Sequence, residues 1–384
     1  MTFWGTRGSC PTFPAPWEVQ EYSGRLSLET VRAVSAYLAE QLEKGVSLEE
    51  LRELLQGAPE KLADELTIDE LPIFGGETTC VEVETSEGNR FIFDWGSGIR
   101  HCASKIMRER GDTRLKQLYL FGSHEHLDHR IGLSFAGFCF ADPPFDIQVF
   151  GNSGVLRALD EHFGFFSHTV SESTYLDDPI DYRVATASFR GFEIRTLDGE
   201  QAEKTDGLWE VWDIAEPIRI GSTVVKPFQV YHGLTGCLGY KIEHGGKSFV
   251  FCTDHEKLSE EVASESGVES GELLRSIRAD EEIGRMCQGV DLAYFDGQYT
   301  RDEYRGRRNI DAKPPVPRVS WGHGCIEDII DRVRDTGIRR ALIGHHDPER
   351  SWPAQLAMNE RLLGFSAGQG FQIELARDGQ VIEL

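Results

Sequence analysis

The chain has 384 residues, an ordinary composition for a globular protein and a formal net charge of -24 at pH 7. This charge argues against sequence-independent binding to nucleic acid or to an anionic membrane over the whole surface, although it leaves room for a local basic patch. No apolar run approaches the ~20 residues of a membrane span, and the N-terminus lacks the character of a signal peptide. The eight cysteines are scattered singly, which is typical of reduced thiols, so we expect a cytoplasmic protein.

A short strand over residues 3–4 opens the chain, and a helical pattern then runs from about residue 15 to about residue 71. Apolar residues recur at helical spacing over 28–42, a second helix follows Ser47, and a third is expected over about 62–71. We expect the apolar stripes of these helices to face the core. Coverage of an active site and a dimer contact are the alternatives.

From residue 75 the pattern changes to β-strands separated by turns and short helices. Several strands share one feature, a polar residue of a metal-binding type at or just after the carboxyl end. A polar ligand at one strand end is unremarkable, but several of them suggest a single site at one edge of the sheets. The residues in these positions are Asp94, His124, His232, Asp254 and His345.

The most informative stretch is 123–129, which reads Ser-His-Glu-His-Leu-Asp-His and follows the apolar strand 118–121. Histidines two positions apart cannot share one face of a helix, so this stretch is predicted to be a loop after a strand. Imidazole and carboxylate ligands suit zinc, iron or manganese. The alternative is a cluster of surface histidines, and the position behind a buried strand favours metal binding.

The stretch from about 163 to 222 is the hardest to interpret and is expected to form strands and loops beside the site. Two separate strands are predicted over 222–225 and 228–230. Acidic, exposed helices are expected over about 256–288, and a further helix over 326–337.

A set of short motifs occurs in a fixed order along the chain. They are Trp-Gly-Thr-Arg-Gly-Ser at 4–9, Phe-Gly-Gly-Glu-Thr-Thr-Cys at 74–80, Asp-Trp-Gly-Ser-Gly at 94–98, His-x-His-x-Asp-His at 124–129, Asp-Gly-Gln-Tyr at 296–299, Trp-Gly-His-Gly at 321–324 and His-His-Asp-Pro at 345–348. This ordered set resembles the metallo-β-lactamase superfamily, and most closely the branch of tRNase Z and the cyclic phosphodiesterases of phosphonate metabolism. The resemblance implies an α/β (α+β) protein with a four-layer αββα sandwich. It would be a single domain over 1–384, with a helical insertion at about 15–71.

The same resemblance implies two divalent metal ions, expected to be zinc, with manganese or iron as alternatives. A water or hydroxide would lie between them. The implied ligands are His124, His126 and His232 for one ion, Asp128, His129 and His345 for the other, and Asp254 as the bridge.

Other roles follow from neighbouring positions. The sequence alone does not separate His345 from the adjacent His346 as a ligand. The resemblance implies that Asp94 anchors the histidine loop without binding metal. Asp128, Asp254 and His323 are the expected catalytic residues. His323 would contact phosphate or act as the general acid, with helix capping as the alternative.

A basic loop lies between residues 301 and 318, where six basic residues face three acidic ones in an otherwise acidic chain. Such a loop would attract an anion to the metals, although ordinary surface charge is an equal alternative. The candidate substrate-binding residues are Arg307, Arg308 and, more weakly, Arg7.

The leading functional hypothesis is a metal-dependent phosphodiesterase for a small or cyclic phosphodiester, acting through the bridging hydroxide. A thioester or lactone hydrolase on the same site is the first alternative, because the metals alone do not select the electrophile. An RNA-processing nuclease and a non-catalytic metal-binding protein are further alternatives. The expected partner is a small anionic substrate. We do not expect the protein to bind nucleic acid or a membrane. A homodimer is left open.

Overall fold

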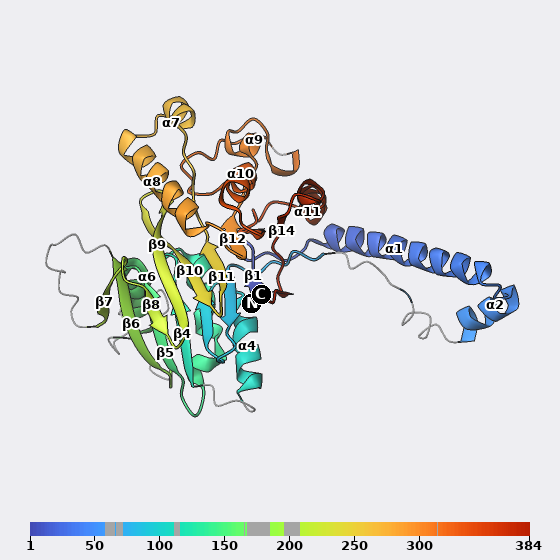
Figure 1. Ribbon diagram of the computed structural model, residues 1–384, viewed down its shortest axis with the longest axis horizontal. Helices are drawn as coiled ribbons and strands as arrows, with labels where there is room; N and C mark the ends of the chain where they lie inside the picture. The colour runs from blue at the N-terminus through green and yellow to red at the C-terminus, as the bar shows by residue number, and fades with distance from the viewer. Residues whose placement is uncertain are drawn as a thin grey trace. The chain divides into compact units, whose positions relative to one another are not determined.

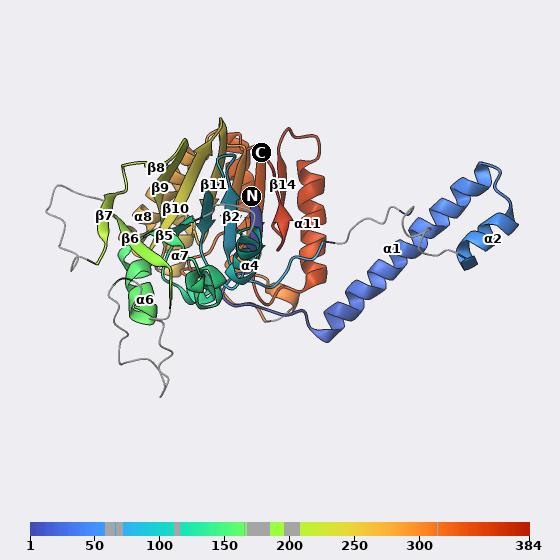
Figure 2. The same cartoon turned by 90° about the horizontal axis from the view of Figure 1, so that it is seen from below.

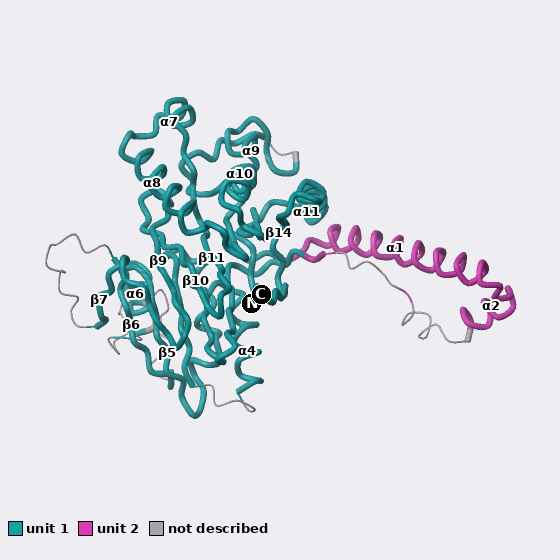
Figure 3. Tube along the Cα trace, in the orientation of Figure 1, with its two compact units in different colours: residues 1–12, 74–384 teal, residues 13–73 magenta. Residues whose placement is uncertain are grey.

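The computed structural model describes residues 1–57, 66, 72–110, 116–164, 166, 185–195, 208–312 and 314–384. The chain divides into two compact units, one of residues 1–12 with 74–384 and one of residues 13–73 (Figure 3). The smaller unit contains the segment that the sequence predicts as a helical insertion.

Among the described residues, eight strands form the first sheet of the larger unit. Figure 1 shows this sheet beside the second one. The pairs from β3–β4 to β6–β7 are parallel, whereas the pairs that involve β1 or β2 are antiparallel. The parallel strands therefore bring their carboxyl ends to one edge. In order across the sheet the strands are β15 (Gln380–Val381), β1 (Thr2–Gly5), β2 (Cys80–Glu84), β3 (Arg90–Phe93), β4 (Gln117–Phe121), β5 (Asp146–Gly151), β6 (Ser188–Arg195) and β7 (Glu210–Asp213).

In the part of the chain that the structure describes, the second sheet has seven strands, of which β11 to β14 are parallel to one another. The strands β8 to β11 are joined by antiparallel pairing, so β9 runs in the same direction as β11. In order across the sheet the strands are β14 (Gln372–Leu375), β13 (Arg340–Gly344), β12 (Leu292–Asp296), β11 (Lys247–Cys252), β10 (Thr235–His244), β9 (Thr223–His232) and β8 (Ile218–Ile220).

Side chains along β3 alternate between two cores, as the two-residue period of a strand requires. Phe91 and Phe93 are buried between the two sheets, whereas Ile92 belongs to a second cluster on the outer face. That second cluster includes Ile99 and Ile106 of helix α4 (Ile99–Glu109), so the outer face of the first sheet is covered by a helix. The continuous apolar pattern of the strand reflects burial on both faces.

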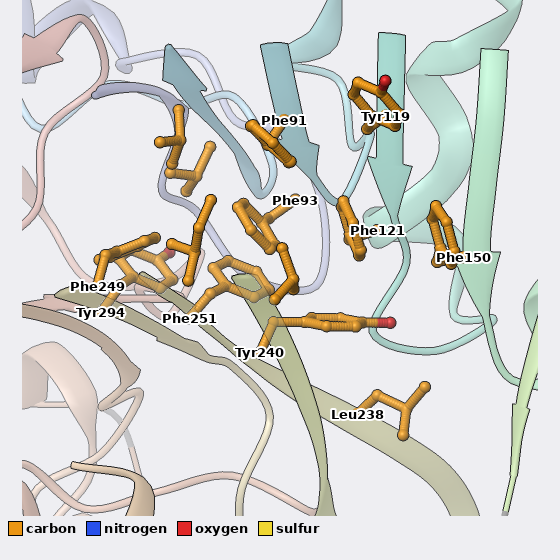
Figure 4. Close-up of a cluster of buried hydrophobic side chains, with 14 of the residues drawn as sticks. Phe91, Phe93, Tyr119, Phe121, Phe150, Leu238, Tyr240, Phe249, Phe251 and Tyr294 are labelled. Atoms are coloured by element: carbon orange, nitrogen blue, oxygen red, sulfur yellow. The ribbon is translucent and has the colours of Figure 1, made fainter. Parts of the chain in front are cut away.

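Aromatic rings fill the space between the sheets (Figure 4). The ring of Phe93 lies 5.3 Å from that of Phe121 in the first sheet and 5.4 Å from that of Phe251 in the second. Tyr240 donates its hydroxyl to the carbonyl of Gly122 at 2.6 Å, which satisfies a polar group that would otherwise be buried alone. Each fully buried aromatic ring contributes about 2 kcal/mol from removal of apolar surface from water.

Helices cover the outer faces of both sheets (Figures 1 and 2). The first sheet carries α4 and α6 (Ser153–Phe163), and the second carries α8, α10 and α11. This arrangement confirms the predicted four-layer αββα sandwich. The helices on the side of the second sheet are α7 (Glu260–Ser266), α8 (Ser270–Met286), α10 (Ile326–Thr336) and α11 (Trp352–Ser366), and the shorter α5 (Leu127–Arg130) and α9 (Arg301–Tyr304) lie in loops near the strand ends.

The smaller unit contains helices α1 (Pro16–Glu43) and α2 (Leu48–Gly57). Ser47 and Glu50 form the predicted capping interaction, with the Ser47 amide 2.8 Å from a Glu50 carboxylate oxygen. The expectation that the stripe on α1 faces a core is wrong, because no residue of α1 is buried and Val31 is 61% exposed. The third predicted helix, over about 62–71, falls almost entirely outside the described residues.

Two further expectations are corrected or limited. The two strands predicted over 222–225 and 228–230 form one continuous strand, β9. It tolerates Pro227 because pairing with β8 ends at Val225, so the missing amide hydrogen costs no bond on that side. Much of the stretch over 163–222 lies outside the described residues. Within the described part of the chain, helices lack the combination of length and hydropathy needed to cross a bilayer.

Candidate metal centre

Polar side chains from both sheets meet at one edge of the sandwich. Asp94 follows β3, His124 follows β4, His232 ends β9, Asp254 follows β11 and His345 follows β13. The strands β3 and β4 are parallel, and so are β11 and β13 through β12, so their carboxyl ends share an edge. The structure therefore brings together the five strand-end residues that the sequence singled out.

The backbone turns sharply where three of these residues leave their strands. Asp94, Asp254 and His345 have φ values of 54°, 48° and 53°, in the left-handed region. This region is uncommon for residues other than glycine, although aspartate, asparagine and histidine enter it more often than most. The packed sheets around these turns hold the strained backbone in place.

The first group of side chains consists of three histidines and one carboxylate, with one ligand atom of each within 4.8 Å of the others. Nε2 of His232 lies 3.1 Å from Nδ1 of His126 and 3.7 Å from a carboxylate oxygen of Asp254. Nε2 of His124 lies 3.6 Å from the same oxygen. These four side chains match the set expected for one metal ion together with the bridge.

The second group consists of Asp128, His129 and His345. Nε2 of His345 lies 3.3 Å from Nε2 of His129 and 3.3 Å from a carboxylate oxygen of Asp128. Asp254 reaches this group as well, with Oδ1 3.3 Å from His345 Nε2 and Oδ2 3.3 Å from His129 Nε2. One carboxylate thus lies against both groups of ligand atoms.

Hydrogen bonds orient three of the rings so that one nitrogen of each is directed into the cluster. Nδ1 of His129 donates to Asp94 at 2.7 Å, and Nδ1 of His232 donates to the carbonyl of Gly322 at 2.7 Å. Ser123 donates its hydroxyl to Asp94 at 2.8 Å, so its oxygen accepts from Nδ1 of His124 at 3.0 Å. When the ring is neutral, each of these hydrogen bonds leaves a lone pair on Nε2, the form in which histidine binds a metal.

The ionisation of the cluster reflects its density of charge. Burial lowers the pKa of His124 well below its usual value and that of His232 to about 4. Burial opposes charge on His129 also, but Asp254, Asp128 and Asp94 together raise the pKa of that ring well above its usual value. Burial would raise the pKa of Asp254, yet the surrounding imidazoles, His129 first, hold that pKa well below its usual value.

The donor set fits a pair of divalent cations. Imidazole nitrogens 3.1 and 3.3 Å apart direct lone pairs toward a common space, and Nε2 of His124 is buried with no hydrogen-bond partner among the described residues. A shared proton would satisfy one such pair, whereas a cation in each group would satisfy the nitrogens of both. Cys237 does not join the set, because its sulfur lies 3.8 Å from Nδ1 of His124, on the far side of the ring.

A third group of possible ligand atoms shares Asp254 and His345 with the first two groups and adds Asp296 and His323. His323 donates Nδ1 to Asp296 at 3.0 Å, and the ring lies 4.8 Å from that of His345. Burial opposes charge on His323, but Asp296, Asp254 and Asp128 raise its pKa to about 9. The sequence places Asp296 at the start of the Asp-Gly-Gln-Tyr motif and gives it no role in the site. The same signal that identified the other strand-end ligands could have assigned it a role.

Comparisons with known proteins add the following. No protein-family model matches the chain, and no curated protein does. Among solved structures, human tRNase Z, short form, is 13% identical over 100% of this chain and 98% of its own, with a TM-score of 0.48. A diphosphatase from the PhnP family is 14% identical over 80% of this chain and 83% of its own, with a TM-score of 0.47. A metallo-β-lactamase fold protein of Bacillus subtilis, YhfI, is 13% identical over 82% of this chain and 95% of its own, with a TM-score of 0.47.

In structure, the chain resembles metallo-β-lactamase fold proteins. With identities of 13–14% and TM-scores of 0.47 and 0.48, the likeness says nothing about substrate. The chemistry of the site rests on this chain's own residues.

His346 and Arg7 lie outside the three groups of ligand atoms. His346 donates Nε2 to the carbonyl of Ala376 at 2.8 Å, and burial lowers the pKa of His346 to about 3. Of the two adjacent histidines, the structure thus places His345 in the cluster. Arg7 is buried, and its guanidinium donates hydrogen bonds to the backbone carbonyls of Asp347 and Gly75.

The basic loop is less available to an anion than its charge suggests. Arg301 pairs with Asp328 and Asp331, and Arg305 pairs with Glu261. Arg318 is buried against the ring of Tyr299. Lys313 lies outside the described residues. The remaining candidates, Arg307 and Arg308, are exposed, and no described contact joins either side chain to the ligand groups.

Proposed function

We propose that this protein is a metal-dependent hydrolase with two metal ions, and that it cleaves phosphodiesters. The observation that carries the proposal is the position of Asp254, whose two carboxylate oxygens reach two separate groups of imidazole nitrogens at 3.3 to 3.7 Å. His124, His126 and His232 would hold one ion. Asp128, His129 and His345 would hold the other. Zinc is the ion we propose, because nitrogen and oxygen donors of this kind suit it well.

The metal pair, when bound, would supply an activated water at neutral pH and would neutralise charge on a phosphoryl oxygen. The chain's own contribution is to keep the ligands in place. Asp94 orients His129 and the Ser123–His124 pair, and the carbonyl of Gly322 orients His232. Because these anchors are buried, the ligands lose little freedom when ions bind.

His323 is the proposed hydrogen-bond donor to the substrate. Its Nδ1 is held by Asp296, and its ring lies beside His345 and 5.2 Å from His232, so it borders both ligand groups. From this position the other ring nitrogen would donate to a phosphoryl oxygen or protonate the leaving alkoxide. The role of Asp296 is to position that ring.

A phosphodiester is favoured over a thioester because it is anionic. His323, held through Nδ1 by Asp296, would present an N–H donor beside the metal ligands, which would stabilise additional negative charge on a phosphoryl oxygen. A neutral thioester or lactone would gain less from this donor and from the two cations before attack. Because a dinuclear site alone does not select between these electrophiles, the choice depends on a direct comparison of substrates.

The test uses purified, zinc-loaded protein with three substrates, a bis-aryl phosphate, a cyclic nucleotide and an aryl thioester. We expect hydrolysis of at least one phosphodiester and its loss in Asp254→Asn. Asparagine tolerates the left-handed backbone at this position, so the variant should still fold. Turnover of the thioester alone would overturn the phosphodiesterase proposal. Unchanged activity of Asp254→Asn would overturn the dinuclear site.

A further inference from the structure

A cavity of about 1280 Å³ lies beside the ligand groups, bordered by β6, β9, β10 and α8. Thr235 and Cys237 belong to its wall. The hydroxyl of Thr235 is 3.5 Å from Nε2 of His126, and the sulfur of Cys237 is 3.8 Å from Nδ1 of His124. The cavity therefore begins one side chain away from the first ligand group.

The size of this cavity bears on the substrate. Sites for small ligands usually enclose about 300 to 1,000 Å³. A cyclic phosphodiester at the metal ligands would leave most of the 1280 Å³ unused. The space suits a substrate whose reacting phosphate lies at the metals and whose remaining part extends along β9 toward α8.

The walls of the cavity are more basic than the rest of the chain. Five basic and three acidic side chains line it, in a chain with a formal charge of -24. Lys226 pairs with Glu243 at 2.7 Å and is therefore neutralised. The lining residues with ionisable side chains are Arg195, Lys226, Arg275, Arg278 and Arg285, with Glu193, Glu281 and Glu282.

Arg278 is the base in this set that is best placed to bind an anion. It is exposed, and the described residues include no ion pair or hydrogen bond of its side chain. Arg275 lies one helical turn earlier on α8 and is held only loosely, 3.8 Å from Glu272. The next residue, Ala279, packs in one cluster with Tyr231, the neighbour of His232. The two arginines thus flank the end of β9.

The cavity also presents an apolar contact close to the metals. Leu234 lies in the turn between β9 and β10, two residues after His232, and is 90% exposed. It lines the cavity together with Val230 and Phe228. A leucine this exposed beside a ligand site loses its contact with water only if a bound molecule covers it.

We propose that this cavity binds the non-reacting part of the substrate, and that the substrate is a nucleotide-sized phosphodiester with a second anionic group. Arg278, assisted by Arg275, binds the second anion, and Leu234 contacts the apolar face of the intervening group. This inference rests on the proposed function for its reaction. The binding site itself stands on the cavity and its charges.

The first test compares two substrates with the same scissile bond, thymidine 5′-(p-nitrophenyl phosphate) and its 3′-phosphorylated form. The wild-type protein should prefer the 3′-phosphorylated form in kcat/KM by about ten-fold, as expected for one charge-assisted contact. Arg278→Ala should abolish that preference through KM. Arg334→Ala, which removes the same charge from α10 outside the cavity, should keep it. Equal use of both substrates by the wild-type protein would overturn the proposal.

The second test separates binding from turnover. Calorimetric titration of the zinc-loaded protein with thymidine 3′,5′-bisphosphate should give about ten-fold weaker binding for Arg278→Ala than for the wild type or Arg334→Ala. If no phosphodiester is cleaved but this difference holds, the proposed function fails and the binding site stands. Leu234→Ser should also weaken binding of the bisphosphate relative to the wild type and Arg334→Ala. Equal affinity of the wild type and both cavity variants would overturn the site.

Discussion

A carboxylate oxygen of Asp94 accepts a hydrogen bond from Nδ1 of His129 at 2.7 Å, and both side chains are buried. The same carboxylate accepts from the amide and the hydroxyl of Ser123, at 2.7 and 2.8 Å. One side chain outside the ligand set therefore fixes the orientation of the loop that supplies four of the proposed ligands.

Asp94→Asn should weaken metal binding without preventing folding. Asparagine suits the left-handed backbone at this position, but its uncharged amide stabilises the orientation of His129 less well than a carboxylate does. Loss of such a supporting contact lowers metal affinity by about 10- to 100-fold. Competition with a chromogenic zinc chelator would measure the change, and an unaltered affinity would show that Asp94 serves the fold alone.

Gly322 and Gly8 leave room for two of the ligand rings. A Cβ at residue 322, where φ is +88°, would lie 2.1 Å from Nδ1 of His232, and one at residue 8 would lie 2.4 Å from Nδ1 of His345. Gly322→Ala should therefore displace His232 and lower the affinity of the first ligand group for its metal ion. Gly8→Ala should displace His345 and lower the affinity of the second ligand group for its ion. Sequential metal titration of the two variants would distinguish these effects.

The matched control for these two variants is Gly284→Ala on α8, where a Cβ meets no atom within 4 Å. This change should keep both ions and raise stability by about 0.5–1 kcal/mol, because alanine favours the helix. If Gly322→Ala and Gly8→Ala bind metal as tightly as this control, the rings are not held where the structure places them.

The adjacent histidines should behave differently when replaced. His345→Gln removes a nitrogen from the second ligand group and should lower the metal content and the activity together. His346→Gln retains a donor for the carbonyl of Ala376, so it should change stability modestly and leave the metal content intact. Elemental analysis of both proteins checks this. The reverse pattern would assign the ligand role to His346.

Asp378 should make stability depend on pH. Burial raises the pKa of this carboxyl to about 7, against hydrogen bonds from Glu77, Thr6 and Gly76 that oppose the rise. In the unfolded chain an aspartate titrates at about 3.9, so between about pH 4 and pH 7 the folded protein holds a proton that the unfolded chain has lost. The contribution of this residue to stability therefore falls as pH rises through that window.

Asp378→Asn removes this titrating group. Between pH 5 and pH 8 the free energy of unfolding of the variant should therefore rise by about 2 kcal/mol relative to that of the wild type, a figure reduced to allow for the partial exposure of the side chain. Urea unfolding of both proteins at several pH values measures the difference. Parallel pH profiles would show that the carboxyl is ionised throughout.

Much of the fold and of the site is readable from local pattern. The strand ends at Asp94, His124, His232, Asp254 and His345 follow apolar runs whose boundaries are sharp in the sequence, and parallel pairing then brings them to one edge. The αββα layering followed from the family resemblance. These features depend on neighbours along the chain and on a rule of topology.

Other features depend on contacts between distant residues and were not predictable. The guanidinium of Arg7 donates hydrogen bonds to the backbone carbonyls of residues 75 and 347, so it has a structural role. Both partners are far from Arg7 in the sequence. His346 and His345 are alike in sequence, and only the carbonyl of Ala376 separates them. The cavity beside β9 arises from the packing of α8 against a strand some 40 residues earlier in the chain, which no local pattern encodes.

The central claim is that Asp254 lies between two metal ions. It is tested most directly by the number of metal equivalents per chain, measured by mass spectrometry of zinc-loaded, gel-filtered protein, for the wild type and for Asp254→Asn. The account predicts two equivalents for the wild type and loss of at least one in the variant. A wild type that retains no more than one, or a variant that retains both, would contradict it.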